Sequence, residues 1–168
     1  LSTGGGAHQG LITPSLGINT PGITYFEPAF AQEVEWILLD AVRSIGSGKG
    51  ESYILRLSTK PIDQTHFPQA SGGLRNAVLN GAYRLRSATP NSETLLNIFA
   101  VGGMIEQAIE SVDALEREGI GVNLVVVTSP DLLYRRMNIA WMDEQAGQDD
   151  GSWDATGDRK GGGVGKGG

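Results

Sequence analysis

The 168-residue sequence predicts an α/β fold with a mostly parallel sheet. Strand-like and helix-like patterns alternate along residues 23–58 and again along residues 95–129, as expected of two βαβ-type units. The segment VNLVVVTS, residues 122–129, adds a third observation. Its nearly continuous β-branched apolar sequence is typical of a central parallel strand that is covered on both faces.

The first unit is predicted to be a strand, a helix and a strand. ITYF, residues 23–26, and SYILRLS, residues 52–58, have strand composition. Between them, Pro28 suits the first turn of a helix because its missing N–H would have no partner there. We expect that helix to end at GSGKG, residues 46–50. Its apolar residues recur at the spacing of one helical face: Phe30, Val34, Ile37, Leu38, Ala41, Val42 and Ile45.

The second unit follows a segment without periodicity. Strand signals lie at residues 81–86, which predict a turn or strand, and at residues 95–101. A helix should then run to Gly119, and Pro130 should open a short helix after the last strand. The helical face before Gly119 consists of Ile105, Ala108, Ile109, Val112 and Leu115.

Three segments lack any regular pattern. Residues 4–22 are dense in Gly, Pro, Thr and Asn and predict a loop. Residues 60–73 hold two prolines and small polar residues, which predict a boundary between domains. Residues 143–168 hold nine glycines and many charges, a composition that predicts a disordered tail.

Composition excludes several classes of function. A net charge of −6 argues against broad binding to nucleic acid or to an anionic membrane. The absence of cysteine excludes a disulfide framework and a thiolate metal site. With no signal-peptide pattern and no long apolar run, we expect a cytoplasmic protein that binds neither nucleic acid nor membrane.

Two glycine motifs resemble phosphate-binding loops. GSGKGE begins after a helix, and Arg43 and Gly50 stand where a phosphate loop needs Gly and Ser or Thr, so we interpret it as a helix-terminating turn. GGM, residues 102–104, lies between a strand and a helix. Its N–H groups could bind an anion, but close helix–strand packing is the alternative interpretation.

The two histidines, His8 and His66, stand far apart in different contexts, which does not predict a metal pair. No nucleophile elbow supports a hydrolase. His66 lies in a proline-flanked segment and is expected to be exposed or at an interface. His8 follows three glycines, a setting that is typical of a solvated loop residue unless a family role applies.

Four segments, in their order along the chain, carry a resemblance to a known family. They are AHQGLITPSLGINTPGITYFEPAFAQEVEWIL, SYILRLSTKPIDQ, VLNGAYRLR and LNIFAVGGMIEQAIESVDALEREGIGVNLVVVTSPDLLYR, which cover most of residues 7–136. This order resembles thiamine diphosphate-dependent enzymes of the transketolase superfamily. It is most similar to the decarboxylating component of homodimeric-type 2-oxoacid (pyruvate) dehydrogenases.

The resemblance implies a piece of a longer enzyme. Residues 1–62 would be the end of a pyrimidine-binding α/β domain, and residues 63–73 a linker. Residues 74–142 would begin a transketolase C-terminal-like α/β domain, followed by the tail at 143–168. The isolated piece is expected to be inactive.

The resemblance also implies a site. His8, followed by Gln9, matches a family histidine that faces the substrate above the cofactor's thiazolium ring. A positioned imidazole can donate a hydrogen bond or a proton to an oxygen on which negative charge develops. Histidine suits this role because it changes protonation near neutral pH.

Thiamine diphosphate and Mg²⁺ are implied for the full-length parent only. The family's GDG-led motif, which holds the diphosphate and the metal, has no match in this chain. The glutamate that activates the cofactor is expected upstream of Leu1. We interpret Glu27, Glu33 and Glu35 instead as acids near a helix N-terminus that complement its dipole.

The implied activity is decarboxylation of a 2-oxoacid and transfer of the acyl group to lipoamide. The implied partners are a second subunit of a homodimer and a lipoyl acyltransferase. A transketolase acting on ketose phosphates is the first alternative, but Thr59 stands where those enzymes carry a phosphate-binding arginine. The second alternative is a stand-alone, non-catalytic α/β interaction module.

Overall fold

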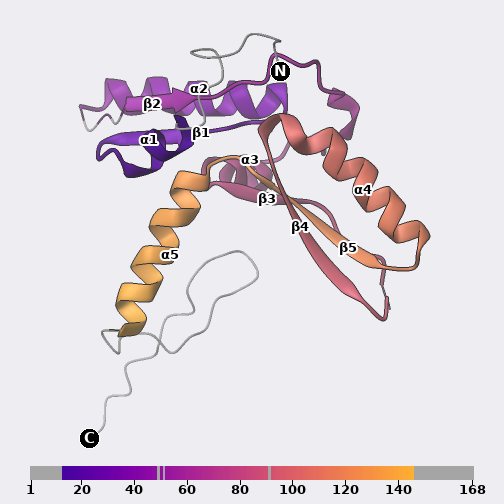
Figure 1. The fold of residues 1–168 in the computed structure, drawn as a ribbon. Coiled ribbons are helices and arrows are strands. Elements are labelled where there is room, and N and C mark those ends of the chain that lie inside the picture. The colour runs from indigo at the N-terminus through magenta and orange to yellow at the C-terminus, as the bar shows by residue number, and fades with distance from the viewer. Residues whose placement is uncertain (1–12, 49, 51, 91, 146–168) are drawn as a thin grey trace, which may run out of the picture. The chain divides into compact units, whose positions relative to one another are not determined.

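The computed structural model describes residues 13–48, 50, 52–90 and 92–145, and it has the predicted α/β fold (Figure 1). The elements, in chain order, are α1 (Thr13–Asn19), β1 (Ile23–Phe26), α2 (Ala31–Gly46), β2 (Ser52–Leu55), the 3-10 turn η2 (Gln64–His66), α3 (Gly72–Leu79), β3 (Ala82–Arg86), β4 (Leu95–Val101), the 3-10 turn η3 (Gly102–Met104), α4 (Ile105–Arg117), β5 (Gly121–Val127) and α5 (Pro130–Gln145).

The strands form two sheets. β1 and β2 pair in parallel with Ile23 opposite Ser52, and α2 connects them, which confirms the first βαβ unit. The second sheet has the order β3-β5-β4. β5 is central, as expected, and runs parallel to β4, but β3 is antiparallel to it. The second sheet is therefore mixed, which differs from the mostly parallel sheet that the sequence predicts.

Helix α2 begins at Ala31, not in the turn around Pro28 that we predicted. The segment before it is held extended: Glu33, the third residue of the helix, accepts hydrogen bonds from the backbone N–H of Ala29 and of the N-cap residue Phe30. Glu33 thus satisfies N–H groups that a helix start leaves without partners. Its predicted position at the helix N-terminus is confirmed, and its contacts there are hydrogen bonds to backbone amides.

The predicted apolar face of α2 is only partly covered. Along its length one stripe is buried: Phe30, Ile37 and Ala41. A neighbouring stripe is 48–68% exposed: Leu38, Val42 and Ile45. Helical spacing shows which residues share a face, but the neighbouring elements decide how much of that face is buried.

Two short helices lie where no helix was predicted. α1 occupies residues that we expected to form a loop, and α3 begins at the end of the expected linker. Ser71 caps α3, because its hydroxyl accepts a hydrogen bond from the N–H of Leu74 at 3.1 Å. β2 also ends at Leu55, three residues earlier than predicted, and α5 is longer than the short helix expected.

The two sheets meet along a buried seam of hydrogen bonds between β1 and the residues after β5. The Ser129 hydroxyl donates to the carbonyl of Tyr25 at 2.6 Å, and the N–H of Tyr25 donates to the Asp131 carboxylate at 3.0 Å. The N–H of Glu27 donates to the carbonyl of Thr128 at 2.7 Å. One apolar core continues across this seam, from Phe26 and Ile37 to the strands and helices of the second sheet. The domain division at residues 63–73 stays a prediction.

Residues up to Leu133 form one compact unit, and the remainder of α5 belongs to a second unit. In that second unit, the described part of the chain is the helix from Tyr134 to Gln145, with Tyr134, Met137 and Ile139 exposed. The predicted disordered tail lies almost wholly outside the described residues.

Candidate functional site

The candidate site lies where the carboxyl ends of β1, β2 and β4 come together. Glu27 follows β1, Arg56 follows β2, and Gly102 follows β4. In open α/β sheets, ligands bind at the carboxyl ends of parallel strands. We call this group of strand ends, with the first turn of α4, the carboxyl edge.

Glu27 is the centre of the first ion pair at the carboxyl edge. Arg56 Nη1 lies 2.9 Å from Glu27 Oε1, and the Tyr25 hydroxyl donates to Glu27 Oε2 at 2.6 Å. Burial, followed by the hydrogen bond to Glu27, raises the pKa of Tyr25, so this phenol remains a hydrogen-bond donor. Glu27 therefore serves as a partner for Arg56, which corrects its predicted role as a helix-dipole acid.

Gly102 and Gly103 bring the turn after β4 directly against β1 and β2. Gly102 has φ +50°, and a Cβ there would lie 3.0 Å from Glu27 Cγ. A Cβ on Gly103 would lie 2.8 Å from Ser58 Oγ. At Gly102, only glycine fits both the left-handed conformation and the close approach. The close-packing interpretation of GGM is thus the one that the structure supports.

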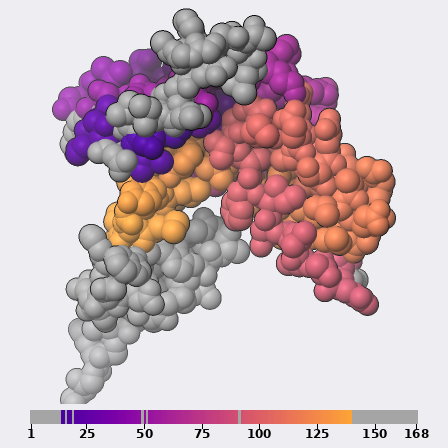
Figure 2. Space-filling view, viewed as in Figure 1, coloured from indigo at the N-terminus to yellow at the C-terminus, as the bar shows by residue number. Residues whose placement is uncertain are grey.

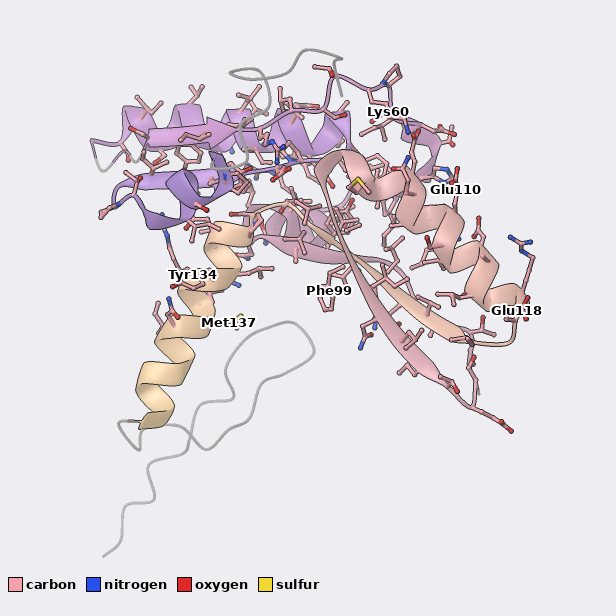
Figure 3. The ribbon with its side chains drawn as sticks, viewed as in Figure 1. Lys60, Phe99, Glu110, Glu118, Tyr134 and Met137 are labelled. Carbon is pink, nitrogen blue, oxygen red and sulfur yellow. The ribbon has the colours of Figure 1, made fainter. Side chains whose placement is uncertain are left out.

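The second ion pair joins the loop after β2 to the first turn of α4. Lys60 Nζ lies 2.6 Å from Glu106 Oε2, and the N–H of Asp63 donates to Glu106 Oε1 at 3.2 Å. The hydrogen bond from Lys60, together with that from Asp63, lowers the pKa of Glu106. Figure 2 shows the two segments side by side on the surface, and Figure 3 shows Lys60 over the first turn of α4.

A shallow hollow of about 200 Å³ opens beside Lys60. Its lining includes Pro28, Ala29 and Phe30 from the segment before α2, and Leu57 and Ser58 from the segment after β2. The hollow combines an apolar wall with the hydroxyl of Ser58 and the ammonium of Lys60. A small molecule with one polar end fits this chemistry.

The charges of the carboxyl edge are balanced within it. Arg56 is paired with Glu27, and Lys60 with Glu106. Thr59, which lies between the two cations in sequence, is exposed and carries no charge. A phosphate group at this edge would therefore share each cation with a carboxylate, or displace the carboxylate, and either weakens phosphate binding relative to an unpaired cation.

The predicted site residues His8 and Gln9 lie outside the described residues. His66 is partly exposed, as expected, with Nε2 3.9 Å from the Asp63 carboxylate. Sequence reasoning did not select Arg56, Lys60 and Glu106. Their signal was position: Arg56 lies near the end of a predicted strand, Lys60 follows that strand, and Glu106 opens a helix at the same edge of the fold.

Two further kinds of feature, a metal site and a membrane-spanning helix, are absent from the described part of the chain. It contains no group of three or more His, Asp or Glu side chains arranged to hold a metal ion. It also contains no helix with the length and apolar character needed to cross a membrane.

No protein-family model matches the sequence, and no curated protein matches it. Solved structures of transketolases are similar in fold. A Pichia stipitis transketolase variant in complex with fructose 6-phosphate matches 74% of this chain with a TM-score of 0.55 and 21% identity. Leishmania mexicana transketolase matches 74% with a TM-score of 0.54 and 19% identity. A split-gene transketolase described as an inactive beta4 tetramer matches 82% with a TM-score of 0.53 and 22% identity.

The chain spans only part of these proteins. It covers 17% of the P. stipitis and L. mexicana chains and 40% of the split-gene chain. At such low identity the likeness shows a shared α/β fold alone.

Proposed function

We propose that the chain is part of a thiamine diphosphate-dependent enzyme that decarboxylates a small 2-oxoacid and transfers the acyl group to lipoamide. The order of its motifs and the transketolase-like fold support the enzyme class. The proposed partners are a second subunit of a homodimer and a lipoyl acyltransferase. The activity belongs to the longer parent protein, and the chain alone is expected to be inactive.

One observation favours a 2-oxoacid over a ketose phosphate. At the carboxyl edge, Arg56 and Lys60 are each engaged by a glutamate, and Thr59 is uncharged. A phosphate ester needs a cation that is free to form charge-assisted hydrogen bonds. A small 2-oxoacid carries one carboxylate charge, whereas a phosphate ester carries about two negative charges, so the balanced edge suits the 2-oxoacid better.

The described residues do not fit the diphosphate and metal of the cofactor. They provide no metal-ligand group, and both cations of the carboxyl edge are paired. We therefore assign cofactor anchoring to another part of the parent enzyme and derive no step through the cofactor. Within this chain, His8 is the proposed catalytic residue, as a hydrogen-bond or proton donor to a substrate oxygen, and Gln9 is proposed to lie beside it.

A transketolase acting on ketose phosphates is the second candidate. Solved structures similar to the chain include transketolases, among them one that was solved with fructose 6-phosphate. This candidate requires that the phosphate be bound by groups outside the described residues or by a cation that exchanges its glutamate for phosphate.

The test compares both substrates on the longer protein that contains this sequence. We expect pyruvate or a related 2-oxoacid to drive reduction of an artificial electron acceptor, and xylulose 5-phosphate to give no product. His8→Ala should lower the 2-oxoacid rate by about 100-fold or more, the size of a general acid–base contribution. Thr59→Arg, a control in the same site, should gain no ketose phosphate activity. Turnover of the ketose phosphate by the wild-type protein would overturn the proposal in favour of the second candidate.

A further inference from the structure

A buried carboxyl group ties the wall of the hollow to the second sheet. Glu33 is fully buried at the start of α2. Its Oε2 accepts hydrogen bonds from the N–H of Ala29 at 2.6 Å and of Phe30 at 3.0 Å. Its Oε1 accepts from the hydroxyl of Tyr83, on β3, at 2.6 Å. Ala29 and Phe30 line the hollow, so one carboxyl group holds both the hollow's wall and the second sheet.

The surroundings of Glu33 are apolar. Phe67 packs between Phe30, Trp36 and Tyr83, with ring centroids 5.4, 5.7 and 6.3 Å away. Among the described residues no cation forms an ion pair with Glu33. A buried carboxylate without a cation is costly even when it is hydrogen-bonded, and protonation removes that cost.

The two protonation states of Glu33 differ in their hydrogen bonds. The carboxylate accepts from all three donors, two amides and the Tyr83 hydroxyl. The neutral acid carries a proton of its own, which can be donated to the Tyr83 oxygen. The hydroxyl proton of Tyr83 then needs another acceptor. Protonation of Glu33 thus removes a buried charge, and in return it weakens one hydrogen bond.

Burial outweighs the hydrogen bonds in this exchange. It raises the pKa of Glu33, although the bonds from Tyr83 and from the Phe30 and Ala29 amides act to lower it. Burial, followed by the charge of Glu33, also raises the pKa of Tyr83. Tyr83 on β3 is the titratable group that faces Glu33, and the groups before and within α2 that face it are backbone amides.

We propose that Glu33 and Tyr83 form a proton-linked lock between α2 and β3. The closed lock keeps Glu33 buried with one proton on its carboxyl group, and exposure of Glu33 to water, when the contact with β3 opens, releases that proton. Because Glu33 also holds Ala29 and Phe30, opening the lock moves the wall of the hollow. The lock is a property of the fold and does not depend on the proposed activity.

The sign of the pH dependence follows from the raised pKa. The folded protein binds the Glu33 proton more tightly than the unfolded chain does, so stability falls as the pH rises. The contribution of the Glu33 proton to the stability of the fold is fully present below the ordinary glutamate pKa of about 4.3. It decreases above that value until the pH exceeds the raised pKa of Glu33.

The test uses Glu33→Gln, which keeps the shape of the side chain and mimics the neutral acid, with one oxygen that accepts and one nitrogen that donates, but cannot titrate. Urea unfolding of the full chain is measured from about pH 4 to pH 8 for the wild type, for this variant and for Glu35→Gln. Glu35 is an exposed glutamate two residues along the same helix. Relative to Glu33→Gln, the folding equilibrium constant of the wild type should fall with rising pH, by up to about tenfold per pH unit within the window. Glu35→Gln should keep the wild-type pH dependence.

Parallel curves for the wild type and Glu33→Gln would overturn the lock. If Glu33→Gln does not fold, carbon-13 NMR of the carboxyl groups in the wild type and in Tyr83→Phe decides instead. The Glu33 resonance should titrate above the ordinary glutamate range, and Tyr83→Phe should raise its midpoint further by removing a bond that favours the charged form. Titration of Glu33 within the ordinary range would refute the proposal. Neither measurement needs cofactor or substrate, so the outcome is independent of the proposed function.

Discussion

Glu33 and Glu106 occupy the same kind of position in two regions of the molecule, yet their environments give them opposite properties. Each lies in the first turn of a helix, Glu33 in α2 and Glu106 in α4. Glu33 is buried among aromatic rings and bonded to neutral donors, and burial raises its pKa. Glu106 is partly exposed beside Lys60, which lowers its pKa. Both glutamates lie in the first turn of a helix, so the partner and the burial decide what each carboxyl group does.

The comparison separates a structural region from an adaptable one. In the hydrogen-bond network of Glu33, every bonded group is buried, and loss of one partner leaves others unsatisfied. At the carboxyl edge, water can replace a lost partner of Glu106 or Arg56. We therefore expect substitutions in the network of Glu33 to change stability, and substitutions at the carboxyl edge to change what that edge binds.

The largest expected effect is that of Glu33→Ala. It leaves the amides of Ala29 and Phe30 and the hydroxyl of Tyr83 without their acceptor. The free energy of unfolding should fall by about 3–5 kcal/mol, measured by urea denaturation. Glu106→Ala is the matched control, also in the first turn of a helix, and should leave stability almost unchanged. Equal losses for the two variants would remove the distinction between the regions.

A smaller effect is expected where the two glycines of the carboxyl edge approach β1 and β2. Gly102→Ala places a Cβ in a left-handed conformation, at φ +50°, and against Glu27. We expect a loss of about 1–2 kcal/mol in thermal or urea unfolding. Gly103→Ala has an ordinary backbone conformation and meets Ser58 Oγ at 2.8 Å and Ser58 Cβ at 3.2 Å, and because the hydroxyl can rotate away, it should cost less. A greater loss for Gly103→Ala would show that Ser58 is held more rigidly than its hydrogen bonds to Lys60 indicate.

The sequence predicts the long elements of this fold better than the short ones. The helical spacing of apolar residues in α2 and α4 and the apolar runs of β4 and β5 are strong signals. These elements span many residues, and their apolar side chains form a buried core. The seven-residue α1 and eight-residue α3 carry too few apolar positions for a period to be detected. In α3 the Ser71 cap was the available signal, because its hydroxyl satisfies an N–H at the helix start.

The site was harder to predict because its contacts join distant parts of the chain. Glu27 and Arg56 are 29 residues apart, and Glu33 and Tyr83 are 50 residues apart. Helical spacing identified Glu33 as a helix-start acid but contained no information about Tyr83. The family resemblance directed attention to His8 and Gln9, which lie outside the described residues, and that prediction remains to be tested.

The smallest expected effect on stability is that of Glu106→Gln, which sharpens the comparison at the edge itself. At neutral pH the variant removes the charge that engages Lys60. Acid cannot easily do the same in the wild type, because Lys60 holds the pKa of Glu106 below its usual range. The released ammonium should bind inorganic phosphate a few-fold more tightly than the wild type does, as measured by phosphorus-31 NMR titration. Glu110→Gln, on an exposed position one turn further along α4, is the control for the change in net charge. If both variants bind phosphate equally, general charge rather than Lys60 governs anion binding, and the paired edge would lose its value as evidence for an unphosphorylated substrate.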